Sequence, residues 1–141
     1  MRFSYEKLQS PRYFQQNREA HRSDAVWYRT EQEMKCRRSS FRMSLDGLWK
    51  FHYAENYECR VPGFQKPEYT CVGWRDIRVP SHIQLEGYHH PHYANTEYPW
   101  EGHETLGHEE IPTISNPVAS YVKYFTVPAN WMGQRVYVSL Q

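Results

Sequence analysis

Residues 79–100 limit the possible folds of this chain more than any other segment. They read VPSHIQLEGYHHPHYANTEYPW and include three prolines, four histidines and four aromatic residues. Pro80, Pro91 and Pro99 each fix φ and remove a backbone hydrogen-bond donor, and the apolar residues follow neither a helical nor an alternating spacing. The sequence therefore predicts a long loop whose path is set by its proline rings, in place of a helix or a central strand.

A proline-stiffened, aromatic loop usually presents a surface to a ligand or a partner. The rings of Tyr88, Tyr93, Tyr98 and Trp100 offer flat apolar faces, and Asn95 offers an amide donor and acceptor side by side. Sugars are bound by this combination, because their C–H faces pack on rings and their hydroxyls hydrogen-bond to amides. The alternative is a connector whose aromatic side chains pack on their own domain, and composition alone favours that alternative.

Four blocks of sequence, in one order along the chain, match the motifs of a known family. The loop matches V-P-S-x-(W/H)-Q-x-x-G-(Y/F)-x-x-P-x-Y-x-N-x-x-Y-P at Val79, Pro80, Ser81, Gln84, Gly87, Tyr88, Pro91, Tyr93, Asn95, Tyr98 and Pro99. The other blocks are residues 17–21 (NREAH), residues 45–51 (LDGLWKF) and residues 116–133, with matches at Asn116, Pro117, Tyr121, Phe125, Val127, Pro128, Trp131 and Gly133. With these blocks, the chain resembles the N-terminal sugar-binding domain of the β-galactosidases in family 2 of the glycoside hydrolases.

The resemblance implies an enzyme whose chemistry lies outside this chain. Hydrolysis of a terminal β-galactoside with retention uses two carboxylates about 5–5.5 Å apart, and in the family both lie on a (β/α)₈ barrel beyond residue 141. We therefore expect no catalytic residue here, and we interpret Glu97, Glu101, Glu109 and Glu110 as solvated surface carboxylates. The magnesium and sodium expected for the full-length family enzyme are likewise expected to bind outside this segment.

One substrate contact is implied within the chain, and it is Asn95. The matching asparagine of the family reaches the active-site mouth, hydrogen-bonds to galactose hydroxyls and positions the substrate without transferring a proton. Tyr93, Tyr98 and Pro99 are then expected to fix the loop that carries it. Without the resemblance, Asn95 is equally a turn-capping amide, which is common in loops.

Charge and histidine spacing argue against two other kinds of binding site. The chain has 17 basic and 16 acidic residues and a formal net charge of +1, so it offers no electrostatic case for nucleic acid or an anionic membrane. His82, His89, His90 and His92 raise the possibility of a metal site, but side chains of adjacent residues diverge in an extended segment. No cysteine or acidic ligand stands at a useful offset, so we predict no metal.

The three cysteines indicate a reducing compartment. Cys36, Cys59 and Cys71 are odd in number and match no zinc spacing, so free thiols are expected. The N-terminus lacks an apolar signal core, and no segment is long enough to span a bilayer. Cytoplasmic residence is therefore the default expectation.

The composition changes near residue 43. Residues 1–43 are polar with scattered aromatic residues, and we interpret them as an extended arm, with a short helix over residues 30–35 that Thr30 caps and Glu33 supports at the capping-box spacing. In the family the arm contacts its own chain and neighbouring subunits, which implies such partners here. The positions near Lys7 and Ser10 lack the acidic ligands of the family's arm magnesium site.

From residue 44 onward the pattern indicates strands. Alternating apolar residues predict strands at 48–53, at 120–127 and at 135–140, with another ending at 77–79. Trp49 and Phe51 are expected on one face, as are Val136 and Val138. The predicted fold class is all-β: residues 44–141 form the N-terminal part of a truncated jelly-roll β-sandwich of the galactose-binding-domain kind, preceded by the arm.

Two interpretations of the chain's length remain open. A jelly roll needs about eight strands, whereas four or five are recognisable here, so we expect a truncated N-terminal piece of a longer β-galactosidase that is inactive alone. The alternative is a stand-alone carbohydrate-binding β-sandwich module. The length of the natural reading frame distinguishes the two interpretations.

Overall fold

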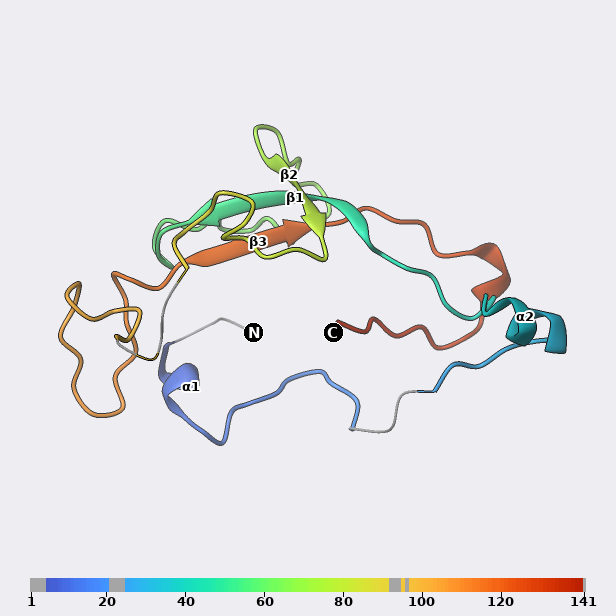
Figure 1. Cartoon of the computed structure of the whole chain (residues 1–141), viewed down its shortest axis with the longest axis horizontal. Helices are drawn as coiled ribbons and strands as arrows, with labels where there is room; N and C mark the ends of the chain where they lie inside the picture. Colours follow the sequence, from blue (N-terminus) through green and yellow to red (C-terminus); the bar gives the residue numbers. More distant parts are fainter. Residues whose placement is uncertain (1–4, 21–24, 92–94, 96, 141) are drawn as a thin grey trace. The chain divides into compact units, whose positions relative to one another are not determined.

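The computed structural model describes residues 5–20, 25–91, 95 and 97–140. Its regular structure is mostly β, and the main element is an antiparallel sheet of three strands in the order β2-β1-β3. The central strand β1 (Gly47–Ala54) lies between β2 (Arg75–Val79) and β3 (Val118–Val122), as Figure 1 shows. The helices are α1 (Tyr5–Gln9), α2 (Glu31–Cys36) and the 3₁₀ turn η1 (Ala129–Trp131).

The chain forms two compact units. One contains Met1–Glu19 and Gly47–Val122, and the other contains Ala20–Asp46 and Lys123–Gln141. The first unit holds the sheet and the loop of residues 79–100, whereas the second holds α2 and η1. The division into an arm of residues 1–43 and a domain of residues 44–141 stays a prediction.

The register of β1 places aromatic residues on one face of the sheet. Trp49 lies opposite Ile77, and Phe51 lies opposite Tyr121, so these four side chains share a face. Phe51 and Ile77 are each 1% exposed, and the Phe51 ring centroid lies 4.9 Å from that of Tyr121. The prediction that Trp49 and Phe51 share a face is therefore confirmed, and this face forms the core of the first unit.

The opposite face of the sheet is covered by the segment that leads into β2. Lys50 forms a 2.8 Å ion pair with its cross-strand neighbour Asp76. Further along the same face, the His52 ring lies 5.4 Å from the ring of Trp74, which donates from Nε1 to the Tyr69 hydroxyl at 3.1 Å. This face of β1 is therefore only partly covered, since Leu48 on the same face is 62% exposed.

The structure agrees with most of the predicted strands. The strands at 48–53 and ending at 77–79 are confirmed as β1 and β2, and the strand at 120–127 is present as β3 but ends at Val122. The all-β expectation is therefore supported at the level of a small, mostly β structure with one sheet of three strands.

The strand predicted at residues 135–140 is wrong. These residues have no strand conformation, and Val136, Val138 and Leu140 are exposed. Alternation determines which side chains would share a face, but a strand also needs a hydrogen-bonded neighbour. In the described part of the chain, the ladders join only β1 to β2 and β1 to β3.

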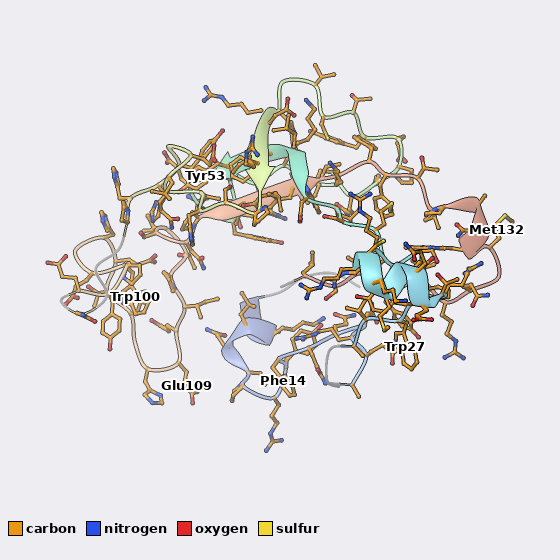
Figure 2. The ribbon with its side chains drawn as sticks, turned by 45° about the vertical axis from the view of Figure 1, so that its right-hand side comes forward. Phe14, Trp27, Tyr53, Trp100, Glu109 and Met132 are labelled. Atoms are coloured by element: carbon orange, nitrogen blue, oxygen red, sulfur yellow. The ribbon has the colours of Figure 1, made fainter. Side chains whose placement is uncertain are left out.

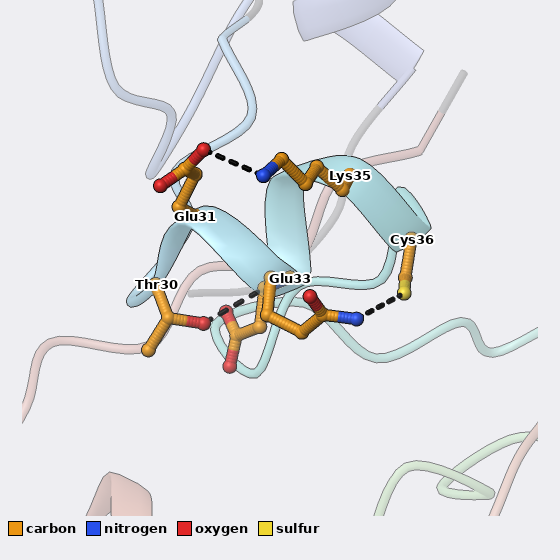
Figure 3. Close-up of polar contacts among 6 residues, drawn as sticks. Thr30, Glu31, Glu33, Lys35 and Cys36 are labelled. Atoms are coloured by element: carbon orange, nitrogen blue, oxygen red, sulfur yellow. Dashed lines mark hydrogen bonds and ion pairs between the residues drawn. The ribbon is translucent and has the colours of Figure 1, made fainter.

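The helix predicted at residues 30–35 is confirmed as α2, together with its cap. The Thr30 hydroxyl accepts a hydrogen bond from the Glu33 backbone N–H at 3.2 Å, and Lys35 pairs with Glu31 at 2.7 Å (Figure 3). The Glu33 carboxylate accepts from the Arg29 N–H at 2.9 Å, one residue before the cap, so the expected capping box is shifted by one position. The hydrogen bond from Arg29 lowers the pKa of Glu33 below its usual value.

The second unit is closed by a contact between segments far apart in the sequence. The Trp131 indole donates from Nε1 to the backbone oxygen of Ser40 at 2.7 Å. Close to Ser40, the Arg29 guanidinium lies over the Phe41 ring, 5.0 Å from its centroid. Trp131, part of the fourth sequence block, therefore ties η1 to the segment that follows α2.

Candidate substrate-contact loop

The loop of residues 79–100 begins with a compact turn that ends in a left-handed glycine. The Gly87 N–H donates to the Gln84 oxygen at 3.3 Å, and the Tyr88 N–H donates to the Ile83 oxygen at 3.0 Å. These two bonds form the Schellman pattern, which needs a left-handed residue at the position that Gly87 occupies with φ +86°. The glycine in the motif is therefore required by a backbone conformation, and the turn directs the next residue, Tyr88, back to the sheet.

Tyr88 anchors the loop to the aromatic face of the sheet. Its ring lies 4.6 Å from that of Phe51 in an edge-on arrangement and 5.8 Å from that of Tyr53. The neighbouring His89, which also has positive φ, lies 6.2 Å from Tyr53. For Tyr88, therefore, the connector interpretation is correct, because this ring packs on its own domain and is not offered to a ligand.

The far end of the loop presents Asn95 and a stacked aromatic pair. Asn95 is exposed and lies in a turn, whereas the predicted supporting residue Tyr93 falls outside the described residues. Tyr98 is 64% exposed, and its ring stacks on that of Trp100 with centroids 5.0 Å apart and planes 7° apart (Figure 2 labels Trp100). Pro99, which lies between Tyr98 and Trp100 in the sequence, is half-buried. The loop therefore offers a polar side chain and an exposed ring close together in sequence.

Reciprocal bonds with Glu101 hold the backbone of the stacked pair. The Glu101 carboxylate accepts from the Tyr98 N–H, and the Glu101 N–H donates to the Tyr98 oxygen, both at 3.0 Å. Glu101 therefore has a structural partner, and its interpretation as merely a solvated carboxylate is incomplete. Glu110 is similar, since it accepts from the Gly107 N–H at 2.6 Å.

Glu104 is the most heavily hydrogen-bonded carboxylate of this region. One of its oxygens, Oε1, accepts from the backbone N–H groups of Thr113, Ile114 and Ser115 at 2.8, 2.8 and 3.0 Å. The Thr113 hydroxyl donates to the other oxygen at 3.3 Å. Partial burial raises the pKa of Glu104, but the backbone hydrogen bonds outweigh this effect, and the pKa lies below its usual value.

The residues bonded to Glu104 also contact the loop of residues 79–100. The Ser115 hydroxyl donates to the Pro99 oxygen at 3.3 Å, and the Glu104 N–H donates to the Trp100 oxygen at 3.1 Å. Glu104 is not predicted from the sequence, because its partners lie 9 to 11 residues away in irregular backbone and leave no periodic pattern. No local signal identifies a carboxylate that bonds to a distant turn.

The region of residues 42–140 is matched by a family model described as "Glycosyl hydrolases family 2, sugar binding domain". The chain belongs to this family. The match includes β1, β2, β3 and the whole loop that carries Asn95. The resemblance inferred from four sequence blocks is therefore correct.

Nearly the whole chain is also similar to longer proteins. It is 47% identical over 135 residues to a protein named β-galactosidase from Halalkalibacterium halodurans and 43% identical over 135 residues to one from Priestia megaterium. These alignments cover 95% and 94% of this chain but only 13% of either relative. A "Beta-galactosidase large subunit" from Latilactobacillus sakei is 34% identical over 146 residues, which cover 95% of this chain and 23% of that protein.

The described part of this sugar-binding domain offers no arrangement suited to a metal. It contains no group of three or more histidine, cysteine, aspartate or glutamate side chains able to hold an ion. His82, His89 and His90 are described, with His89 turned onto Tyr53, whereas His92 lies outside the described residues. The described residues therefore supply no side-chain group of this kind for the magnesium and sodium that the family resemblance implies for the full-length enzyme. Among the same residues, no helix combines the length and apolar character needed to cross a membrane.

Proposed function

We propose that this chain is the N-terminal sugar-binding segment of a β-galactosidase that hydrolyses terminal non-reducing β-D-galactose, as in lactose. The observation that carries this proposal is the 47% identity to a protein of that name across 95% of the chain. The segment supplies substrate positioning and subunit contacts, and the two catalytic carboxylates lie in the remainder of the enzyme. The complete domain is a jelly-roll sandwich, of which the three-stranded sheet is a part.

Within this segment, Asn95 makes the substrate contact. Its exposure supports this role, because an exposed amide is accessible to a sugar hydroxyl. Tyr98 and Pro99 support the loop through the stacked pair and the bond from Ser115, and Tyr93 belongs to the same motif. Asn95 donates to and accepts from galactose hydroxyls, so it orients the sugar without taking part in proton transfer.

The partners of this segment are the rest of its own polypeptide, neighbouring subunits and the galactoside, with neither nucleic acid nor a membrane among them. Any magnesium and sodium are bound by the rest of the enzyme, in the cytoplasm. A stand-alone carbohydrate-binding module is less well supported, because the relatives share nearly all of this chain and extend far beyond it.

The test of this function is the variant Asn95→Ala in the complete enzyme. Loss of one hydrogen bond to a sugar hydroxyl costs about 0.5–1.5 kcal/mol, so kcat/KM for a nitrophenyl galactoside should fall by roughly 2- to 13-fold. Gel filtration and the melting temperature should match those of the wild type, because Asn95 is exposed. Unchanged kinetics would assign Asn95 to a structural role in its turn.

A further inference from the structure

A closed set of hydrogen bonds joins three parts of the chain next to the substrate-contact loop. The Glu104 backbone N–H holds Trp100, the Glu104 carboxylate holds residues 113–115, and the Ser115 hydroxyl holds Pro99. Since Pro99 and Trp100 are adjacent, the connections return to their starting point. We call this set the Glu104 ring.

The carboxylate is the part of the ring that other side chains could least easily replace. Three successive backbone N–H groups, from Thr113 to Ser115, converge on Oε1 of Glu104 within 3.0 Å. Such a concave row of donors favours a negatively charged acceptor. Bonds of this kind are roughly twice as strong as those between neutral groups. If the carboxylate were removed, the three donors would lose their shared acceptor, and the turn would lose the hydrogen bonds that hold it in this geometry.

The ring lies immediately after the residue that is proposed to contact substrate. Asn95 precedes Tyr98 by three residues, and the backbone of Tyr98 is fixed by Glu101 and its side chain by Trp100. On the other side of Asn95, Tyr88 anchors the chain to the sheet. The chain is therefore held on both sides of Asn95. Tyr88 holds it on the N-terminal side, and the Glu104 ring holds it on the C-terminal side.

We propose that Glu104 is a positioning residue for the substrate contact of Asn95, an inference that rests on the proposed function. Glu104 does not touch the sugar. It fixes the backbone position of Pro99 and Trp100. Through them it sets the position of the Asn95 amide relative to a galactose hydroxyl. Binding geometry of this kind is costly to lose, because a small misplacement of a positioning group weakens every contact it makes.

The experiment compares two substitutions of Glu104 in the complete enzyme. Glu104→Ala removes the acceptor and should lower kcat/KM for a nitrophenyl galactoside by about 2- to 10-fold, mainly through a higher KM. Glu104→Gln keeps a carbonyl oxygen in the place of Oε1 but loses the charge, so its kcat/KM should fall, and by less than that of Glu104→Ala. Glu110→Ala is the matched control, since Glu110 is another loop glutamate whose carboxylate accepts from a nearby backbone group, the Gly107 N–H, outside the Glu104 ring. Its kinetics should not change.

A double variant shows whether the effect passes through Asn95. If it does, Glu104→Ala should have little further effect on kcat/KM once Asn95→Ala is present, so the two changes should be clearly non-additive. Fully additive losses, or a Glu104→Ala enzyme with wild-type kinetics, would overturn the inference. Where Glu104→Ala does not give folded enzyme, Glu104→Asp takes its place, because it keeps the charge but is one methylene too short to reach the three donors.

The outcomes also separate this inference from the function on which it depends. An Asn95→Ala enzyme with unchanged kinetics contradicts the proposed role of Asn95, and the inference fails with it. An impaired Asn95→Ala enzyme combined with an unimpaired Glu104→Ala enzyme contradicts the inference alone. A Glu104→Gln enzyme more impaired than the Glu104→Ala enzyme would also overturn it, because the retained carbonyl oxygen would then give the loop no support.

Discussion

At the scale of single residues, carboxylates that a sequence pattern predicts to be merely solvated accept hydrogen bonds from the backbone and order it. Glu33 closes the start of α2, Glu101 holds Tyr98, and Glu104 collects three backbone donors. Each of these side chains is partly or largely exposed, so its contribution depends on geometry and on its charge state more than on burial. The pH at which the charge is lost therefore becomes a testable property of the loop.

The conformational order of residues 113–115 should depend on pH. Hydrogen bonds lower the pKa of Glu104 below the reference value of 4.5, so the folded loop favours the charged form. The stabilisation is complete above the unfolded pKa and is lost as the pH falls through the lower, folded pKa. Hydrogen exchange of the complete enzyme, followed by mass spectrometry, should show that protection of peptides covering these residues weakens as the pH falls below the reference value of 4.5.

The matched control for this effect is Glu104→Gln. Its side chain does not titrate, so protection of the same peptides should lose this step in its pH dependence while the rest of the enzyme keeps its own. A wild-type loop whose protection has the same pH dependence as that of Glu104→Gln, while the enzyme stays folded, would contradict the proposed role of the carboxylate in ordering the turn.

At the scale of elements, the aromatic contacts of Tyr88 join the loop to the sheet. Tyr88 touches Phe51 and Tyr53, and Gly87 supplies the backbone conformation that turns Tyr88 inward. An aromatic pair of this kind contributes about 0.5–1.5 kcal/mol beyond the area it buries. The mobility of the loop should therefore respond to this ring more than to the exposed rings of Tyr98 and Trp100.

Tyr88→Ala should loosen the substrate-contact loop, whereas Tyr88→Phe should not. The alanine variant removes the packing on Phe51, while phenylalanine keeps the ring and loses only the hydroxyl. In the complete enzyme, limited proteolysis within residues 79–100 should be faster for Tyr88→Ala, and KM for the galactoside should rise. Equal proteolysis rates for the two variants would assign the anchoring of the loop to other residues.

Local patterns in the sequence predict the elements that short stretches of residues determine. The period of two in residues 48–53 and the Thr30 cap with Glu33 three residues later correctly predict β1 and α2. The same period fails at residues 135–140, because alternation carries no information about a hydrogen-bonded partner. The inward turn of Tyr88 and the bonds of Glu104 also escape prediction, since both depend on residues that are distant in sequence. The position of Asn95 on an exposed turn agrees with the motif, whereas its contact with sugar stays a prediction.

At the scale of the whole molecule, large apolar side chains remain uncovered. Phe14 is 74% exposed, Trp27 76% and Met132 83%, and all three are labelled in Figure 2. Val136 and Val138 are exposed in the segment that lacks strand conformation. Exposed apolar side chains that gather into a patch favour contact with a partner or aggregation. This agrees with the proposal that the chain works as part of a larger enzyme.

The isolated chain should therefore fold poorly and show no hydrolysis of a galactoside. Mixed with a family enzyme that lacks its own N-terminal segment, it should restore some activity, because docking buries the exposed apolar groups and stabilises the folded form by linkage. The measurement is hydrolysis of a chromogenic galactoside by the mixture and by each component alone. A soluble, cooperatively melting chain that never restores activity would contradict this expectation and favour the stand-alone module. Turnover by the purified chain, abolished by a substitution within it, would contradict the assignment of the chemistry to the remainder of the enzyme.

The strand order β2-β1-β3 has a consequence for the newly made polypeptide. The central strand is the first of the three to be synthesised, and β3 follows it by about 60 residues. At roughly 5–20 residues per second, one edge of β1 therefore waits about 3–12 s for its neighbour after it leaves the ribosome. During that interval Phe51 lacks the ring of Tyr121, and only the earlier pairing with β2 and the arrival of Tyr88 shield it. The loop that is proposed to contact substrate would thus first pack on the nascent sheet and shield Phe51 from water.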